Sequence, residues 1–131
     1  KDGRFFSDVV VTGGHMASIA AIREGRADVA AIDSITWGLH ERYAPETLAG
    51  IRILAETPMG PGLPYITRLS ADDAEVAALR DSLAELIADA ANREVLDRLG
   101  LTGIELLSDA DYAELEAFDA EARRLDYPKV A

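Results

Sequence analysis

Two glycines and a histidine stand where an apolar segment gives way to a helical pattern. The sequence there is Val11-Thr12-Gly13-Gly14-His15, and Ser18 follows within one turn of the expected helix. The first N–H groups of a helix have no acceptor inside it, and the helix dipole makes that end positive, so it can hold an anion. Glycines let an anion approach the backbone, and hydroxyl and imidazole groups can donate to it. The pattern indicates an anion site made of Thr12, Gly13, Gly14, His15 and Ser18; a plain turn without a ligand is the alternative.

A carboxylate ends the second apolar segment of the chain. Residues 27–33 read Ala-Asp-Val-Ala-Ala-Ile-Asp and finish at Asp33. In open α/β sheets, ligands bind beyond the carboxyl ends of the strands. We therefore expect Asp33 to share one crevice with residues 12–15. The alternative is that Asp33 caps the helix that follows it.

The sequence lacks the motifs of common catalytic and cofactor sites. His15 and His40 are the only histidines, and their separation of 25 residues fits no metal site. The absence of cysteine excludes disulfides, thiolate zinc sites and cysteine nucleophiles. The two glycines lack the Lys-Ser/Thr pair of a P-loop and the third glycine of a dinucleotide fingerprint, and no Gly-x-Ser-x-Gly elbow occurs. We therefore expect no enzyme activity, no cofactor and no metal site.

Charge and composition divide the chain near its middle. The 131 residues carry 13 Lys and Arg against 24 Asp and Glu, a net charge of −11, which argues against a nucleic-acid partner or an anionic membrane surface. No apolar run approaches the ~20 residues that a membrane span needs. Residues 57–64 hold three prolines and two glycines and cannot form a helix. We expect a boundary there between two units, residues 1–62 with a net charge of −2 and residues 63–131 with −9.

The first unit alternates between strand and helix patterns. β-Branched and aromatic runs predict strands, and apolar stripes predict helices. The strands are expected at residues 5–11, 27–33 and 51–55, and the helices at residues 15–24 and 34–43. Gly25 is placed to end the first helix and Ser34 to cap the second. Short links between successive elements predict parallel strands joined by right-handed crossovers, which is an α/β fold.

The second unit opens with a short strand at residues 63–67 and is then mainly helical. Ser70-x-x-Asp73 is close to a capping box, and the apolar spacing after it predicts a long helix with one buried face. That face consists of Val76, Leu79, Leu83, Leu86 and Ile87. A short helix ends at Gly100, a strand is expected at residues 104–107, and Ser108-x-x-Asp111 begins the last helix. Its inward side chains are expected to be Tyr112, Leu115, Phe118 and Leu125.

These motifs together resemble a known family. The run Thr-Gly-Gly-His-x-x-Ser from Thr12, the Gly-x-Ala-Asp-x-Ala-x-x-Asp run from Gly25 and Pro61-Gly62-Leu63-Pro64-Tyr65 are similar to the phosphate, phosphite and phosphonate substrate-binding proteins of bacterial ABC transporters. Those are type II periplasmic binding proteins, and the resemblance covers about residues 5–105. It implies a three-layer α/β/α lobe portion, followed by a mainly helical C-terminal portion that returns to the other lobe.

The resemblance also implies how this chain relates to such a protein. Residues 1–62 would form part of the second ligand-binding lobe, and residues 63–131 a hinge strand and the C-terminal helical part of the first lobe. The chain would be the C-terminal half, without the first-lobe sheet and its own anion-binding turn. The implied function is to bind a phosphorus oxyanion or phosphonate in an inter-lobe cleft, in the periplasm, and to present it to an ABC permease in the membrane.

Two positions depart from the family pattern. Gly14 stands where the family usually has Ser, so one hydroxyl donor is missing. Members that bind an aminoalkylphosphonate carry an acid just after the second strand, whereas here Asp33 comes two residues earlier. A small oxyanion without an amine is therefore preferred to aminoethylphosphonate. The alternatives are a binder of sulfonate, nitrate or a thiamine precursor on the same fold, a same-fold enzyme, or the effector domain of a transcription regulator.

Overall fold

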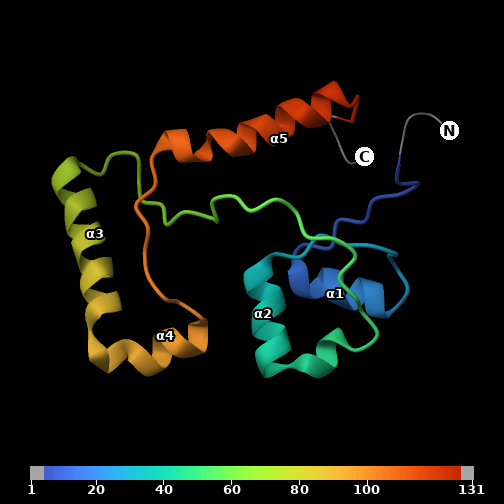
Figure 1. The fold of residues 1–131 in the computed structure, drawn as a ribbon, viewed down its shortest axis with the longest axis horizontal. Helices are drawn as coiled ribbons and strands as arrows, with labels where there is room; N and C mark the ends of the chain where they lie inside the picture. Colours follow the sequence, from blue (N-terminus) through green and yellow to red (C-terminus); the bar gives the residue numbers. More distant parts are fainter. Residues whose placement is uncertain (1–4, 128–131) are drawn as a thin grey trace. The chain divides into compact units, whose positions relative to one another are not determined.

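A computed structural model describes residues 5–127 of the chain. The backbone contacts divide it into two compact units, Lys1–Pro58 with Phe118–Ala131, and Met59–Ala117. Figure 1 shows the helices of both units in chain order. None of the helices in the described part of the chain is long and apolar enough to cross a membrane.

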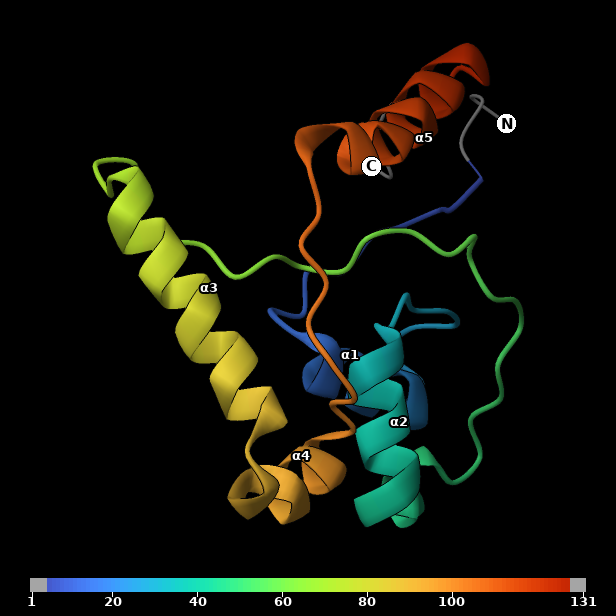
Figure 2. The ribbon, with the colours of Figure 1, turned by 60° about the vertical axis from the view of Figure 1, so that its left-hand side comes forward.

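The first unit is built around α1 (His15–Arg23), α2 (Ser34–Tyr43) and the 3-10 turn η1 (Pro45–Leu48). The small core includes Ile19 and Ala21 of α1, which are 3% and 0% exposed. Figure 2 shows α1 beside α2, and η1 contacts both helices. Thr47 joins η1 to α2, because its hydroxyl donates to the carbonyl of Ala44 (2.6 Å) and lies 2.7 Å from Nδ1 of His40. The bond of Thr47 to His40 ties η1 to the last turn of α2.

Helix ends in the first unit follow the sequence signals closely. The expected end of α1 at Gly25 is confirmed: its φ is +68°, its N–H donates to Ile22, and the N–H of Arg26 donates to Ala21 at 2.8 Å. This is the Schellman arrangement that glycine permits. The expected cap at Ser34 is wrong by one residue. Asp33 is the N-cap of α2, and Ser34 is its first helical residue.

The strands predicted for the first unit are not confirmed. Residues 5–11, 27–33 and 51–55 contain no strand assignment, and the described chain from 5 to 127 has no β-ladder. The apolar side chains of these segments stay open to solvent; they include Val9, Val10, Val11, Val29, Ile53 and Leu54. A strand needs backbone partners in a neighbouring strand. The three segments do not pair with one another, so the α/β/α layering remains an expectation.

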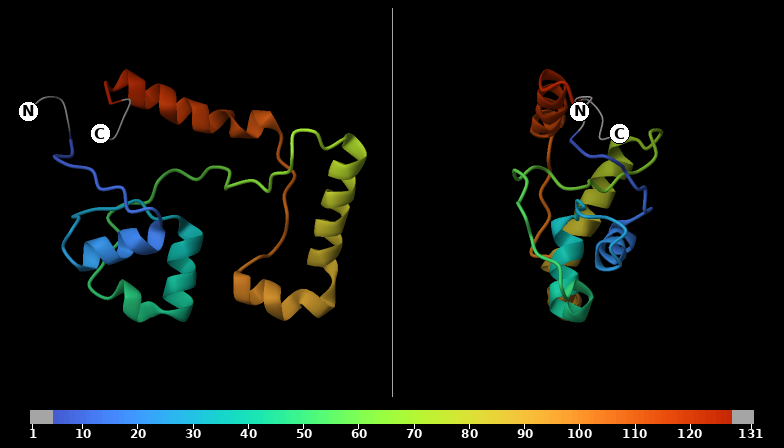
Figure 3. Two further views of the ribbon diagram at one scale, coloured as in Figure 1. Left: turned by 180° about the vertical axis from the view of Figure 1, so that it is seen from behind. Right: turned by 90° about the vertical axis from the view of Figure 1, so that its right-hand side faces the viewer.

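The second unit contains α3 (Asp73–Ala88), η2 (Ala90–Asn92), α4 (Arg93–Leu99), η3 (Asp109–Tyr112) and the first residues of α5 (Ala113–Arg124). The expected strands at residues 63–67 and 104–107 are likewise absent. Figure 3 shows these stretches as helix-free links between the helices. Leu96 of α4 is the buried side chain of this unit among the described residues, at 6% exposure.

Three helix boundaries of the second unit test the sequence signals. Gly100 ends α4 in the left-handed conformation (φ +70°, ψ 22°), as expected. Ser108 begins η3, which leads into α5, and its N–H donates to the Asp111 carboxylate at 2.7 Å. The cap expected at Ser70 is wrong, since α3 is capped by Asp72 in a box with Glu75.

The buried apolar faces expected on α3 and α5 are also wrong for this structure. Leu79 and Leu86 of α3 are 50% and 46% exposed. On and after α5, Leu115, Phe118 and Leu125 are exposed as well. A helix face becomes buried only where another element covers it. Val76, Leu83, Ile87 and Tyr112 are half-buried, and no described residue of α3 or α5 is fully buried.

Candidate functional site

The turn before α1 leaves its backbone donors open. Gly13 adopts φ +88° and Gly14 is extended, with φ 171° and ψ 166°. Gly14 is the N-cap but has no side chain to cap with, and the first helical bond is from Ser18 N–H to the Gly14 carbonyl at 3.0 Å. Within residues 5–127, the backbone N–H groups of residues 14–17 donate to no protein acceptor. These donors are therefore available to a ligand, as expected from the sequence.

Thr12 and Ser18 form hydrogen bonds that stabilise this turn. The Thr12 hydroxyl donates to the carbonyl of Gly14 at 3.2 Å, and its oxygen lies 2.7 Å from the Ser18 hydroxyl. Because a hydroxyl has one hydrogen, Ser18 must be the donor of the second bond. Both hydroxyl hydrogens thus serve bonds inside the protein. In this arrangement the two residues support the turn and do not offer free donors.

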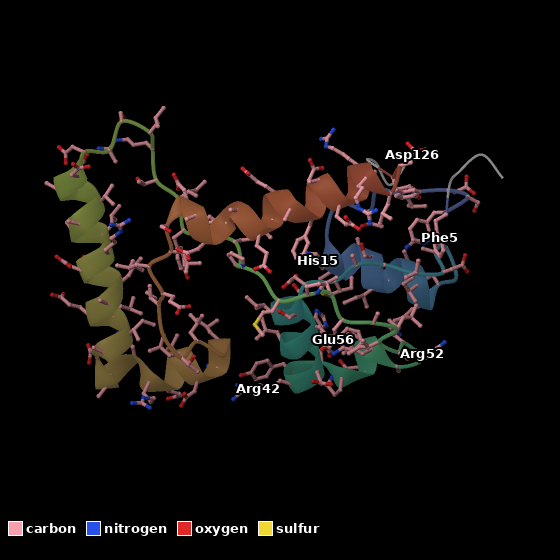
Figure 4. The ribbon with its side chains drawn as sticks, turned by 45° about the horizontal axis from the view of Figure 1, so that its top comes forward. Phe5, His15, Arg42, Arg52, Glu56 and Asp126 are labelled. Carbon is pink, nitrogen blue, oxygen red and sulfur yellow. The ribbon has the colours of Figure 1, made fainter. Side chains whose placement is uncertain are left out.

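His15 opens α1 and contacts a carboxylate from the next helix. Its Nε2 lies 3.0 Å from Oδ2 of Asp33. The side chains of His15 and Asp33 are 48% and 41% exposed, so the pair is accessible to solvent. Figure 4 labels His15 at the start of α1. The structure thus brings Asp33 to His15 at the turn before α1, and the crevice expected to contain both stays a prediction.

Asp33 serves two elements at once. Its Oδ1 accepts the backbone N–H of Thr36 at 2.8 Å, which confirms the alternative that it caps α2. Its Oδ2 is the atom that meets His15. Hydrogen bonds from the hydroxyl and backbone N–H of Thr36 lower the pKa of Asp33 below its ordinary value of 3.8, and His15 lowers it further. The carboxylate is therefore ionised at neutral pH and can only accept hydrogen bonds.

Thr36 is the residue of this cluster that sequence reasoning missed. The signal was present, because Asp33-x-x-Thr36 has the spacing of an N-cap residue and its N3 partner. The six residues expected from the sequence lie together in the first unit: Thr12, Gly13, Gly14, His15, Ser18 and Asp33. No group of three or more metal-ligating side chains is present in the described chain.

The arrangement combines a positive helix end with an exposed, carboxylate-bound imidazole. The free N–H groups and the helix dipole favour an anion at the first turn of α1. Nothing lies within 4 Å of a Cβ built on Gly13 or Gly14, so the backbone can be approached directly. Chemically, the turn is suited to holding a small oxyanion.

The chain was compared with protein families, curated proteins and solved structures. The family model described as ABC transporter, phosphonate, periplasmic substrate-binding protein matches residues 1–112. Neither the curated proteins nor the solved structures contain a match to the chain. The family match includes every residue of the candidate site.

Proposed function

The chain belongs to the family of periplasmic substrate-binding proteins of phosphonate ABC transporters, and from this membership we propose that it binds a phosphorus oxyanion or phosphonate at the first turn of α1. The observation that carries the proposal is the family match over residues 1–112. The family consists of binding components of transporters and is not an enzyme family. The open N–H groups at residues 14–17 support the location of the site.

A small oxyanion without an amine fits the site better than aminoethylphosphonate. An ammonium group needs a carboxylate that is free to accept it. Asp33 already accepts bonds from Thr36 and from His15. Each oxygen of Asp33 already has one donor, and this acid stands two residues earlier than the acid of the family members that bind an aminoalkylphosphonate, which supports phosphate, phosphite or a simple alkylphosphonate as the ligand.

We extend the proposal to the organisation of the whole binding protein. Residues 1–62 contribute to the second lobe, and residues 63–131 supply a hinge strand and the C-terminal helical part of the first lobe. The exposed valines at residues 9–11 support this assignment, because strand pairing in an α/β lobe would cover them. A ligand held between two lobes stabilises the closed form only through contacts that improve on closure. The closed form then presents the ligand to a permease in the membrane.

A ligand panel tests the proposed function on the complete protein. Thermal shifts are measured with phosphate, phosphite, methylphosphonate, aminoethylphosphonate, sulfate, nitrate and taurine. We expect stabilisation by at least one of the first three and a smaller effect of aminoethylphosphonate. Stabilisation by sulfate, nitrate or taurine alone would assign the chain to another ligand class on the same fold. Absence of any shift, with no binding by calorimetry, would contradict the proposal.

His15→Ala is the variant that tests the site itself. A hydrogen bond to a charged group contributes about 1.5–3 kcal/mol, so the variant should bind its best oxyanion at least about tenfold more weakly. Arg23→Ala is the matched control, since it removes a cation from the opposite end of α1. That end lies about 12 Å away, beyond the screening length at physiological salt. The oxyanion affinity of Arg23→Ala should therefore stay within about twofold of the wild-type affinity. Equal affinity of His15→Ala and the wild type by calorimetry would remove His15 from the site.

A further inference from the structure

One face of α5 is apolar along the whole length of the helix, which Figure 1 shows as one uninterrupted element. Its apolar side chains recur at intervals of three and four residues and therefore share one side: Leu115, Phe118, Ala122 and Leu125. Leu115 and Phe118 are each 41% exposed, and Leu125 is 62% exposed. Leu115 also lies against Gly60, whose Cβ position is 3.4 Å from Cδ2 of the leucine. Much of this apolar face remains open to a partner.

The family match does not extend to this helix. It ends at residue 112, and α5 begins at Ala113. The two proposed lobes are drawn from the family, and they account for cover over elements inside the match, such as α3. α5 lies outside the match, so the chemistry of the helix itself must indicate what covers its apolar face.

The charges of α5 are separated along its length. Glu114 and Glu116 lie in the first turn, and Arg123 and Arg124 lie in the last. In the described part of the chain, neither glutamate has an ion-pair partner. A second helix of the same sequence, running antiparallel, places a basic last turn against each acidic first turn. Opposite charges then face each other at both ends of the helix pair.

The two carboxylates in the middle of α5 are balanced within the helix. Nε of Arg123 donates to Asp119 at 2.9 Å, and Nε of Arg124 donates to Glu121 at 2.7 Å. Each guanidinium keeps further N–H groups, because it carries five in all. Both arginines can therefore hold their bonds inside the helix and also face the glutamates of a second copy.

The apolar positions of α5 are symmetric about residue 120. An antiparallel copy aligned on that residue places Leu115 opposite Leu125 and Phe118 opposite Ala122, so that each large ring meets a small side chain. The net charge of −11 opposes association through most of the protein surface. A face that is apolar and has complementary charges at its two ends is the exception, which favours a second copy as its occupant.

We propose that α5 pairs with α5 of a second copy, in antiparallel orientation, so that the complete binding protein forms a homodimer. The pair uses no residue of the candidate ligand site, so this inference goes beyond the proposed function. A helix of 12 residues is ~18 Å long. Its face is small beside the total of about 1,200 Å² or more that a stable interface buries, so the dimer is weak and reversible.

Sedimentation velocity of the complete protein measures this association. The sedimentation coefficient should rise from the monomer value toward the dimer value between about 1 and 200 µM protein, where weak interfaces become populated. Phe118→Glu places a charge in the apolar face and should raise the dissociation constant of the dimer at least about tenfold. Ala120→Glu is the matched control, because residue 120 is exposed on the opposite side of the helix, and it should change that constant by less than about twofold.

Charge reversal tests the direction of the pairing. Arg123→Glu with Arg124→Glu, and separately Glu114→Arg with Glu116→Arg, bring like charges together at the helix ends and should each weaken the dimer at least about tenfold. A mixture of the two double variants restores opposite charges at both ends and should dimerise within about threefold of the wild type. This recovery also shows that both variants remain folded. In a parallel pair, like charges already meet, so reversal without any loss of dimer would contradict the antiparallel arrangement.

Two further outcomes would overturn the inference. A complete protein that remains monomeric up to about 200 µM would show that its own chain covers the apolar face of α5. A dimer that Phe118→Glu and Ala120→Glu weaken equally would show that the copies associate through another surface. Both outcomes leave the proposed ligand binding standing, because the helix pair and the candidate site share no residue.

Discussion

Asp33 shows how one side chain can connect the fold of this unit to its chemistry. One oxygen holds the first turn of α2 through Thr36, and the other holds the ring of His15. Loss of the carboxylate therefore has two separable consequences. The first is on helix stability and the second is on the ligand site. Substitutions that keep or remove the capping oxygen distinguish them.

Asp33→Ala should lower the free energy of unfolding by about 1 kcal/mol, whereas Asp33→Asn should lower it by much less, because only alanine removes the cap. Urea denaturation of both variants measures the difference.

The pKa of Asp33 is lower in the folded chain than its ordinary value of 3.8. Its charge therefore contributes stability above pH 3.8 that disappears as the pH falls through the folded pKa. The difference in free energy of unfolding between the wild type and Asp33→Asn should shrink as the pH falls below 3.8. A difference that grows there would contradict this role of the charge.

Adjacent glycines at the turn should respond oppositely to the same substitution. Gly14 is extended, with open space at its Cβ position. Gly14→Ser therefore supplies an N-cap hydroxyl and should raise the free energy of unfolding by ~0.3 kcal/mol. Gly13 has φ +88°, so Gly13→Ser should destabilise by about 1 kcal/mol or more. Thermal denaturation compares them. Equal changes in melting temperature for Gly13→Ser and Gly14→Ser would contradict the different backbone conformations of the two glycines.

The structure brings the residues of the candidate site together, but their hydrogen-bond partners do not follow from their spacing in the sequence. The sequence pattern placed Thr12 and Ser18 near an anion site as donors. Their hydroxyls instead bond to each other and to the Gly14 carbonyl. A hydroxyl can satisfy itself locally or meet a ligand, and spacing alone does not decide between these outcomes. Spacing likewise does not decide whether Asp33 caps α2 or contacts His15, and in the structure it does both.

Helices and their ends were the most predictable elements. Glycines at positions 25 and 100 end helices in the left-handed conformation, which few other residues adopt. N-caps were less certain because several capping residues stand close together. Ser34 follows Asp33, and Ser70 precedes Asp72. At the start of α3 the sequence did hold a deciding signal, the Glu75 that completes a capping box with Asp72.

Strands could not be settled from sequence in the same way. A helix satisfies its backbone bonds internally, whereas a strand depends on partners that are distant in the sequence. The valine-rich segment at residues 9–11 has strand propensity but no ladder partner within the described chain. Strand propensity alone therefore does not ensure that these segments pair.

The capping box of α3 provides a test at this scale. The Asp72 side chain accepts the Glu75 N–H at 2.9 Å, and the Glu75 side chain accepts the Asp72 N–H at 3.1 Å. Asp72→Ala should destabilise the protein by about 1 kcal/mol. Asp73→Ala is the matched control, because it removes a neighbouring carboxylate that does not form the box and should cost about 0.3 kcal/mol. Equal losses for the two variants in urea denaturation would contradict the assigned cap.

The described chain leaves many large apolar side chains exposed to solvent. Leu63, Ile66 and Leu79 are among the large apolar side chains left open to solvent. A chain in which 49% of residues are hydrophobic can bury far more than this. Apolar surface of this extent marks a site that another surface covers. In the proposed two-lobed protein, strands and helices of both lobes provide that cover.

Residues 1–131 expressed alone should therefore bind a hydrophobic dye such as ANS and self-associate as the concentration rises, because the uncovered helix faces favour association. Dye fluorescence and sedimentation velocity measure the two effects. Leu79→Glu together with Leu86→Glu, on the exposed face of α3, should reduce both. A monomer that binds no dye would mean that these faces are covered by the chain itself.

In the proposed function, the uncapped N–H groups at the start of α1 hold an oxyanion. The most direct measurement is an NMR titration of the ¹⁵N-labelled complete protein with phosphite, following the backbone amides of residues 14–17. The account predicts saturable shifts of these amides at one common affinity, reduced by at least about tenfold in His15→Ala. Saturable phosphite binding that leaves residues 14–17 unshifted would contradict it.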